Sequence, residues 1–285
     1  MKDVIQYIIE TLICGGLFML LYRAVIARRA SFGFARGYLI VATLLSAVIP
    51  LMRIPVYPAG TAQLTIPLIN MGDITVERAP EVALAAIPWG SIYLAAYVAV
   101  TVLMLIMLLR EAAGIRSIRK TATIAEGEIY RLFISPKVTS PFSFGRSIYT
   151  GDTLSESEFR QVVAHESSHI RHRHPAEKTL MTILRLAMWY NPFVWMARKW
   201  LIEVHEYQAD NDVLTAGHDI TEYRLLILKQ ILGYNPDITC GLNNSLTKKR
   251  FLTMTKLKNN KRNNLWTISS SLLLAGGLMM LFSFT

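Results

Sequence analysis

Four long apolar stretches constrain this sequence more than any other feature. Residues 37–52, 88–109 and 265–284 carry no charged side chain, and residues 4–21 are interrupted only by Gln6 and Glu10. About 20 apolar residues are enough for a helix to cross the hydrocarbon core of a bilayer. Hydrophobic residues make up 52% of the 285, too many for an ordinary soluble protein. The sequence therefore predicts an α-helical membrane protein with about four transmembrane helices, and buried core helices are the alternative.

The net charge of the sequence is +10, and the positions of its basic residues predict how the chain is oriented in the membrane. Arginine and lysine are concentrated in residues 23–36, in residues 110–120 and in residues 248–262, whereas residues 53–87 hold more acids than bases. Basic loops stay on the cytoplasmic side of a membrane. We therefore expect a multi-pass protein of the bacterial cytoplasmic (inner) membrane, with the amino terminus and the 53–87 loop outside. The segment between the third and fourth spans is then cytosolic.

Two features of the ends of these spans exclude other interpretations. The first span is too long for a signal-peptide core, and Tyr22 and Arg23 follow it instead of a small-residue cleavage site, so it is expected to stay as an anchor. The basic stretch at 248–262 directly precedes a span. We therefore expect it to face anionic lipid and to set the topology, with no direct nucleic-acid contact.

One motif in the polar part of the chain carries recognisable chemistry, His165-Glu166-Ser-Ser-His169. Histidines four apart on a helix project from one face and can reach one Zn²⁺, and the glutamate between them is placed to activate water as a general base. Ser155 followed by Glu158 predicts a capping box at the start of this helix. The sequence predicts His165 and His169 as zinc ligands and Glu166 as the catalytic base, and two solvated histidines are the alternative. The two cysteines, Cys14 and Cys240, lack the spacing of a cysteine-type zinc site or a disulfide framework.

A catalytic zinc needs a third protein ligand, and the later motif Glu203-Val-His-Glu206-Tyr-Gln-Ala-Asp210 offers one. Its three acids lie on one face of the expected helix. We assign Glu206 as the third ligand and Asp210 as the carboxylate that orients a ligand imidazole. An ordinary charged helix face is the alternative. The residues left open as rival ligands or as oxyanion-stabilising groups are Glu203, His205, His172 and Tyr207.

The segment around these motifs has the pattern of a small α+β domain. Residues 128–135 and 143–150 are rich in Tyr, Phe and Ile and predict two strands. The zinc helix is expected to end near Pro175 and a second helix to cover residues 176–190. Asn191 followed by Pro192 predicts the cap and first residue of a third helix that runs to about Leu214.

Four motifs follow one another here: Ser-Pro-Phe-Ser-Phe-Gly at 140–145, the His-Glu-Ser-Ser-His motif at 165–169, Tyr-Asn-Pro at 190–192 and the Glu-Tyr-Gln-Ala-Asp motif at 206–210. In this order they resemble the BlaR/MecR family of membrane antirepressor metallopeptidases. The resemblance implies a gluzincin-type zinc endopeptidase that faces the cytoplasm, is activated from outside and cleaves a DNA-binding repressor. The best-known members continue after the last span into a penicillin-binding sensor, whereas this sequence stops at Thr285, which argues against a β-lactam signal. The family also often carries Asp near the position of His174.

We therefore expect three parts: residues 1–109 with three spans and the outward loop, residues 110–264 as a cytosolic zinc-peptidase domain, and residues 265–285 as the fourth span. The expected cofactor is Zn²⁺. The expected partners are membrane lipid and a cytosolic winged-helix repressor, with cleavage of its own chain near 248–262 as an additional reaction. A homodimer is left open.

Two other functions stay open. A membrane-protein quality-control or prenyl-protein protease of the HtpX/Ste24 type shares H-E-x-x-H and E-x-x-x-D, but the motif at 140–145 and the short topology weigh against it. A catalytically inactive transmembrane receptor or scaffold is the third function. A receptor or scaffold would not need the intact ligand set that this sequence has. The metal content of the purified protein would distinguish it from a metallopeptidase.

Overall fold

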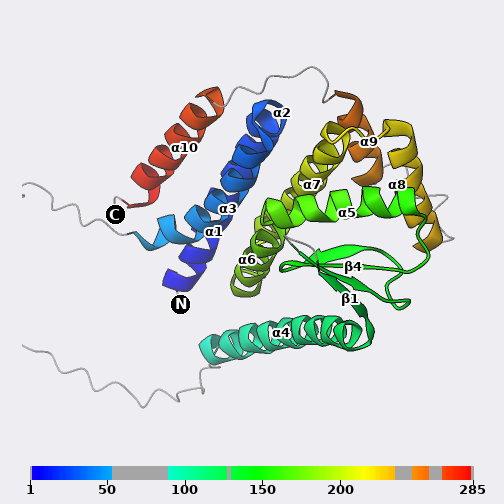
Figure 1. Cartoon of the computed structure of the whole chain (residues 1–285). Helices are drawn as coiled ribbons and strands as arrows, with labels where there is room; N and C mark the ends of the chain where they lie inside the picture. The colour runs from blue at the N-terminus through cyan, green and yellow to red at the C-terminus, as the bar shows by residue number, and fades with distance from the viewer. Residues whose placement is uncertain (1, 53–88, 127–129, 235–245, 257–264, 284–285) are drawn as a thin grey trace, which may run out of the picture.

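The computed structural model describes residues 2–52, 89–126, 130–234, 246–256 and 265–283, and in these ranges the chain is mainly helical with one small sheet (Figure 1). The expected outward loop at 53–87 lies outside the described residues, as do the basic residues 257–262. The mostly helical class with a small sheet agrees with the sequence prediction.

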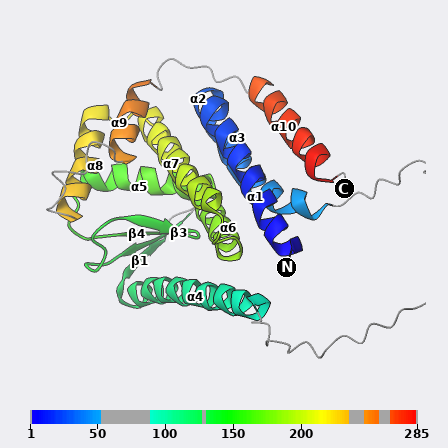
Figure 2. The ribbon, with the colours of Figure 1, turned by 180° about the vertical axis from the view of Figure 1, so that it is seen from behind.

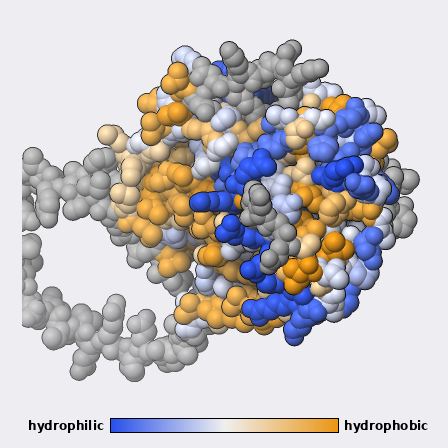
Figure 3. Space-filling view, in the orientation of Figure 1, coloured by the Kyte–Doolittle hydropathy of each residue, from blue (hydrophilic) through white to orange (hydrophobic). Residues whose placement is uncertain are grey.

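Within the described ranges, four helices are long and apolar enough to cross a membrane, as predicted. They are α1 (Lys2–Leu21), α3 (Phe32–Val48), α4 (Trp89–Thr121) and α10 (Leu265–Ser283). A π-helical turn η1 (Tyr22–Ile26) and α2 (Ala27–Arg29) continue α1, and a 3-10 turn η2 (Ile49–Leu51) continues α3. Large apolar side chains such as Leu20, Leu103 and Leu273 are exposed along these helices. Apolar surface gathers on their side of the molecule in Figure 3, which is the surface that lipid would cover.

Helices α1, α3 and α10 run side by side, whereas α4 lies at an angle to them next to α6 (His174–Ala187) (Figures 1 and 2). The Tyr97 hydroxyl on α4 donates to the Ala187 carbonyl at 2.7 Å, and its ring stacks on Trp189. The apolar run ends at Leu109, but helix α4 continues to Thr121 because the residues after Leu109 are mostly good helix formers. The expected boundary between residues 109 and 110 therefore falls inside one continuous helix.

In the described part of the chain, four strands form a mixed sheet with the order β1-β2-β4-β3. They are β1 (Thr123–Glu126), β2 (Arg131–Ile134), β3 (Phe142–Phe144) and β4 (Ser147–Thr150). β2 pairs with β4 in parallel, and the outer pairs β1–β2 and β3–β4 are antiparallel. The prediction of two strands was incomplete. Gly145 adopts φ +60° and turns the chain, so residues 143–150 form a hairpin instead of one strand, and β1 was not predicted.

Helix α5 (Glu156–Arg171) begins with the predicted capping box. The Ser155 hydroxyl accepts from the Glu158 amide at 3.3 Å, and the Glu158 carboxylate accepts from the Ser155 amide at 2.9 Å. The helix ends at Arg171, before the expected Pro175, because Arg173 takes the left-handed conformation with φ +60°. Helix α6 then starts at His174, which turns its ring back toward α5.

Helix α7 (Pro192–Thr215) joins the apolar helices to the rest of the protein, and α8 (Ile220–Tyr234) and α9 (Leu246–Lys256) pack near its end. Its predicted cap is confirmed, since the Asn191 side chain accepts from the Phe193 amide at 2.9 Å. Ala197 and Leu201 in its first half are fully buried in a core shared with α1 and α3. Gly15 on α1 permits this close packing, because a Cβ there would lie 3.1 Å from the Phe193 side chain. The second half of α7 packs on α5, so it stands beside the H-E-x-x-H motif.

Candidate metal centre

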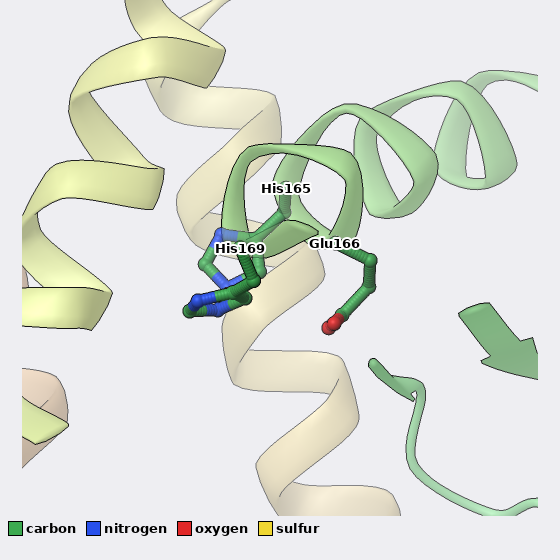
Figure 4. Close-up of side chains that lie close together, drawn as sticks. All are labelled: His165, Glu166 and His169. Atoms are coloured by element: carbon green, nitrogen blue, oxygen red, sulfur yellow. The ribbon is translucent and has the colours of Figure 1, made fainter. Parts of the chain in front are cut away.

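Helix α5 presents both histidines of the motif on one face, with Glu166 pointing to the same side (Figure 4). The two Nε2 atoms of His165 and His169 lie 3.1 Å apart. His169 is buried, and His165 is partly buried. As the sequence predicted, the spacing of four residues brings two imidazole nitrogens close enough to bind one ion.

Helix α7 adds the Glu206 carboxylate to this pair. One of its oxygens lies 3.4 Å from His165 Nε2, and the other lies 3.5 Å from His169 Nε2. In a tetrahedral zinc site with bonds of about 2.0–2.1 Å, neighbouring ligand atoms are about 3.3 Å apart. Each of the three observed separations is close to this value, with one Glu206 oxygen near each histidine, and the nitrogen and oxygen donors are those that zinc accepts. The residues therefore fit a zinc ion held by three protein ligands.

The pKa values of the three donor residues depend on one another and on burial. Burial lowers the pKa of His169 well below its usual value, with the neighbouring His165 acting in the same direction, so His169 is in the neutral form that binds metal. Burial opposes the charge on Glu206, but the hydrogen bond from His165 and the Arg250 cation outweigh it and hold the pKa of Glu206 well below its usual range. Burial opposes a charge on His165, but the hydrogen bond and the negative charge of Glu206 outweigh it and raise the pKa of His165 above its usual value.

Glu166 lies beside the ligands in a cleft of about 220 Å³. Its carboxylate is buried, and burial raises its pKa above the usual carboxyl value in spite of the nearby His165. A base with a raised pKa is better matched to proton transfer near neutral pH. The other lining residues come from the segment that leads into β3 and from α5, α6, α8 and α9: Ser140, Pro141, Phe142, Ser143, Val162, Lys178, Tyr223, Leu226, Ile227, Gln230 and Arg250.

A tyrosine and an arginine support the outer side of His165. The Tyr223 hydroxyl on α8 donates to Asp210 Oδ1 at 2.8 Å and lies 2.7 Å from His165 Nδ1. Because it donates to Asp210, it accepts from Nδ1–H of His165, which leaves Nε2 free for a metal. Arg250 on α9 binds both Asp210 oxygens, at 2.9 and 2.5 Å, and lies 3.2 Å from Glu206. Asp210 thus orients His165 mainly through Tyr223, since its direct separation from Nδ1 is 3.6 Å.

The outer side of His169 faces a second imidazole. His169 Nδ1 lies 2.7 Å from Nδ1 of His174, which is fully buried. The His174 ring stacks on His205 with a centroid separation of 4.0 Å, and His205 Nε2 lies 2.7 Å from a Glu177 oxygen. Burial lowers the pKa of His174 far below its usual value, with the charges of its neighbours adding to the effect. His174 is therefore neutral and can accept a proton in a hydrogen bond from His169.

A comparison with protein families decides which family this site belongs to. Residues 2–254 match the family described as BlaR1 peptidase M56. The chain belongs to this family. The resemblance to the BlaR/MecR type inferred from the motifs is thereby confirmed, and the M56 protein is a membrane-associated metallopeptidase. No curated protein matches the sequence.

The structure places the rival ligands of this M56 peptidase away from the three donor atoms. His172 pairs with Asp212 at 2.9 Å, and Glu203 accepts from Lys249 at 2.7 Å. The His205 ring is turned toward Glu177, as described above. Tyr207 and His205 are both outside the described lining of the cleft.

Sequence reasoning missed two residues that the M56 site contains. Tyr223 stands in no recognisable motif, and only its position one turn into α8 brings it to His165. Arg250 belongs to the basic stretch that was expected to face lipid and set the topology. The Arg250 side chain is only 14% exposed and binds the carboxylates of Glu206 and Asp210 on α7, whereas the topology-setting role of the stretch stays a prediction. The charge of Arg250 suggests an acidic partner, but the sequence does not reveal that the partners are Asp210 and Glu206.

Proposed function

We propose that this chain is a membrane-anchored zinc endopeptidase of gluzincin type whose cleft faces the cytosol and which cleaves a cytosolic transcriptional repressor. The observation that carries the proposal is the close approach of His165, His169 and Glu206 to one another beside the buried carboxylate of Glu166. A receptor without catalysis would have no need for this combination of ligands and base.

The chemistry follows from the residues of the cleft. Bound zinc supplies a Lewis acid for the scissile carbonyl and brings the pKa of water toward neutrality. Glu166 takes the proton from the attacking water and delivers it to the leaving amine. Lys178 and Arg250 line the same cleft and add positive charge where the carbonyl oxygen becomes negative. They join Tyr207 and His205 as candidate oxyanion-stabilising groups.

The edge of the sheet supports a substrate in extended conformation. β3 is one of the two outer strands of the described sheet, and its residues Phe142 and Ser143 line the cleft next to Glu166. An extended peptide can pair with such an edge through its main chain. Val162, Leu226 and Ile227 form an apolar part of the cleft that suits a large apolar side chain of the substrate. A folded domain does not fit here, so a linker of the repressor is the segment that is cut.

The position of the charges supports a cytosolic substrate. The segments that flank the peptidase part are basic, and basic segments stay on the cytoplasmic side of the membrane. A peptidase placed there can report an outside event only by cutting a protein inside. A repressor that binds DNA is such a protein, and it is the substrate that the BlaR/MecR resemblance implies.

The test is to co-express a candidate winged-helix repressor with wild type or Glu166→Gln and to follow the size of the repressor. Removal of a general base typically costs about a hundredfold to ten-thousandfold in rate, so fragments should disappear with the variant. Glu156→Gln is the matched control, because Glu156 is exposed on the same helix and pairs only with Arg160 among the described residues. Equal fragmentation by wild type and Glu166→Gln would refute the catalytic assignment, and fragments of the enzyme alone would indicate self-cleavage without a repressor substrate.

A further inference from the structure

A hollow of about 580 Å³ lies beside α6 and α7 and shares no lining residue with the cleft of the metal centre. This volume is within the range of about 300–1,000 Å³ that is typical of small-molecule sites. Arg185 of α6 lines it together with Arg198 and Lys199 of α7, so three cations border one space. The acid in its lining, Glu203, is paired with Lys249 at 2.7 Å. The hollow is therefore positively charged and suits an anion. The other lining residues are Trp195, Met196, Ile202 and Leu246.

Each of the two arginines has a buried donor without a partner. The Nε atoms of Arg185 and Arg198 are both buried, and neither has a hydrogen-bond partner among the described residues. The Arg185 guanidinium lies over the Trp195 ring, 4.7 Å from its centroid, which holds it in place and leaves its N–H groups available. Burial lowers the pKa of Arg198 below its usual value, and the charge of Arg185 acts in the same direction, against the attraction of Glu111. Unused buried donors and repulsion between like charges both destabilise a protein, and a bound anion would remove both.

The hollow lies near the end of a candidate span. Tyr22 follows α1 directly, and its ring stacks on Trp200 of α7 with a centroid separation of 5.0 Å. Arg198 and Lys199 directly precede Trp200 in α7. They therefore lie near the point where the apolar helix α1 gives way to Arg23. The polar headgroups of a bilayer lie at this level, and tryptophan is enriched there.

A second hollow, of about 610 Å³, adjoins the first at Met196, which lines both. Its lining comes from α1 and α7 and is mainly apolar, with Leu20, Phe193 and Trp200 among its residues. Leu20 is 68% exposed, so this hollow opens on the surface that lipid would cover. A positive hollow beside an apolar one is complementary to a molecule with an anionic head and a hydrocarbon chain. A free phosphate ion would use only the first of the two.

We propose that Arg185 and Arg198 bind the phosphodiester headgroup of an anionic phospholipid, and that an acyl chain of this lipid lies along Met196 toward the second hollow. The two guanidinium groups donate charge-assisted hydrogen bonds to the phosphate oxygens, and Lys199 adds positive charge. The bound phosphate removes the repulsion between the arginines and holds α6 on α7 at the membrane surface. This site goes beyond the proposed function, because it depends on insertion of the apolar helices in a membrane and not on catalysis.

The experiment follows the tryptophan fluorescence of the full chain in detergent micelles that contain a brominated phospholipid, because bromine quenches tryptophan and Trp195 lines the hollow. Brominated phosphatidylglycerol should quench at a lower mole fraction than brominated phosphatidylcholine, whose headgroup has no net charge. Arg185→Gln/Arg198→Gln should raise the half-saturating mole fraction of phosphatidylglycerol at least about tenfold, since a lost hydrogen bond to a charged group typically costs about a factor of ten. The control is Arg116→Gln/Lys120→Gln, which removes the same charge from exposed residues of α4 that do not line the hollow.

Equal quenching by the two lipids would overturn the proposal, and so would equal half-saturating mole fractions for Arg185→Gln/Arg198→Gln and the control pair. Displacement of phosphatidylglycerol by inorganic phosphate at the same concentration would also overturn it, because it would indicate a site for a soluble anion. Arg185→Lys/Arg198→Lys serves if the glutamine pair fails to fold. It keeps both charges but loses the forked donors, so it should bind phosphatidylglycerol more weakly than wild type. Binding equal to that of wild type would refute the role of the guanidinium groups.

Discussion

Replacing Tyr223 by phenylalanine removes one hydroxyl group and almost nothing else. That hydroxyl lies between His165 Nδ1 and Asp210 Oδ1, at 2.7 and 2.8 Å, and Tyr223 is 2% exposed. Phenylalanine keeps the ring packing on α5 and α8. His165 then loses the acceptor that keeps its proton on Nδ1, while Asp210 keeps its two bonds from Arg250.

The expected loss can be given a magnitude. Substitution of a group that orients a metal-bound histidine typically weakens metal binding about tenfold to a hundredfold. This corresponds to about 1.4–2.8 kcal/mol of binding free energy. The metal-free variant should also unfold more easily, because an unsatisfied buried donor costs about 1–3 kcal/mol of stability.

The assay is a competitive zinc titration of the purified protein in detergent, together with thermal unfolding of the metal-free form. Tyr207→Phe is the matched control, since it removes a hydroxyl from a partly buried tyrosine on α7 that is outside the described lining of the cleft. Zinc affinity of Tyr223→Phe equal to that of wild type would refute the reasoning. It would show that Tyr223 fills space without orienting His165.

Two further predictions concern the ligand set and the topology. Glu206→Gln should lose most of the bound zinc in elemental analysis, whereas Glu203→Gln should keep about one zinc per chain; the opposite result would make Glu203 the third ligand. Reporter fusions or thiol labelling at Ala59 and Gly217 should report opposite sides of the membrane, with Ala59 external, and the same side for both would exclude the four-span arrangement.

Local signals in the sequence predicted the parts of this structure that depend on neighbouring residues. The capping box at Ser155, the cap at Asn191 and the apolar helices each arise from a few adjacent side chains and were found correctly. The end of α5 was predicted too late, because the left-handed Arg173 is not a residue type that marks a helix end. The strands were predicted incompletely, because four-residue strands contain too little pattern to separate a hairpin from one longer strand.

The contacts between distant segments were the part that the sequence did not reveal. The spacing of His165 and His169 follows from one helix, so the motif alone predicts their geometry. The approach of Tyr223 and of Arg250 depends on how α8 and α9 pack on α5 and α7, and no local pattern encodes that packing. A charged residue in a basic stretch has the same sequence signature whether it faces lipid or reaches a buried carboxylate.

The position of helix α7 affects how the protein is expected to unfold. Its first half, with Ala197 and Leu201, is part of the same apolar core as α1 and α3, and its second half carries Glu206. A fragment of residues 110–264 would leave that first half without its partners and expose the core surface to water. We therefore expect residues 110–264 not to fold on their own. We also expect the anchor and the candidate metal site to unfold together, and a detergent that separates the apolar helices to disturb the donor residues on α7.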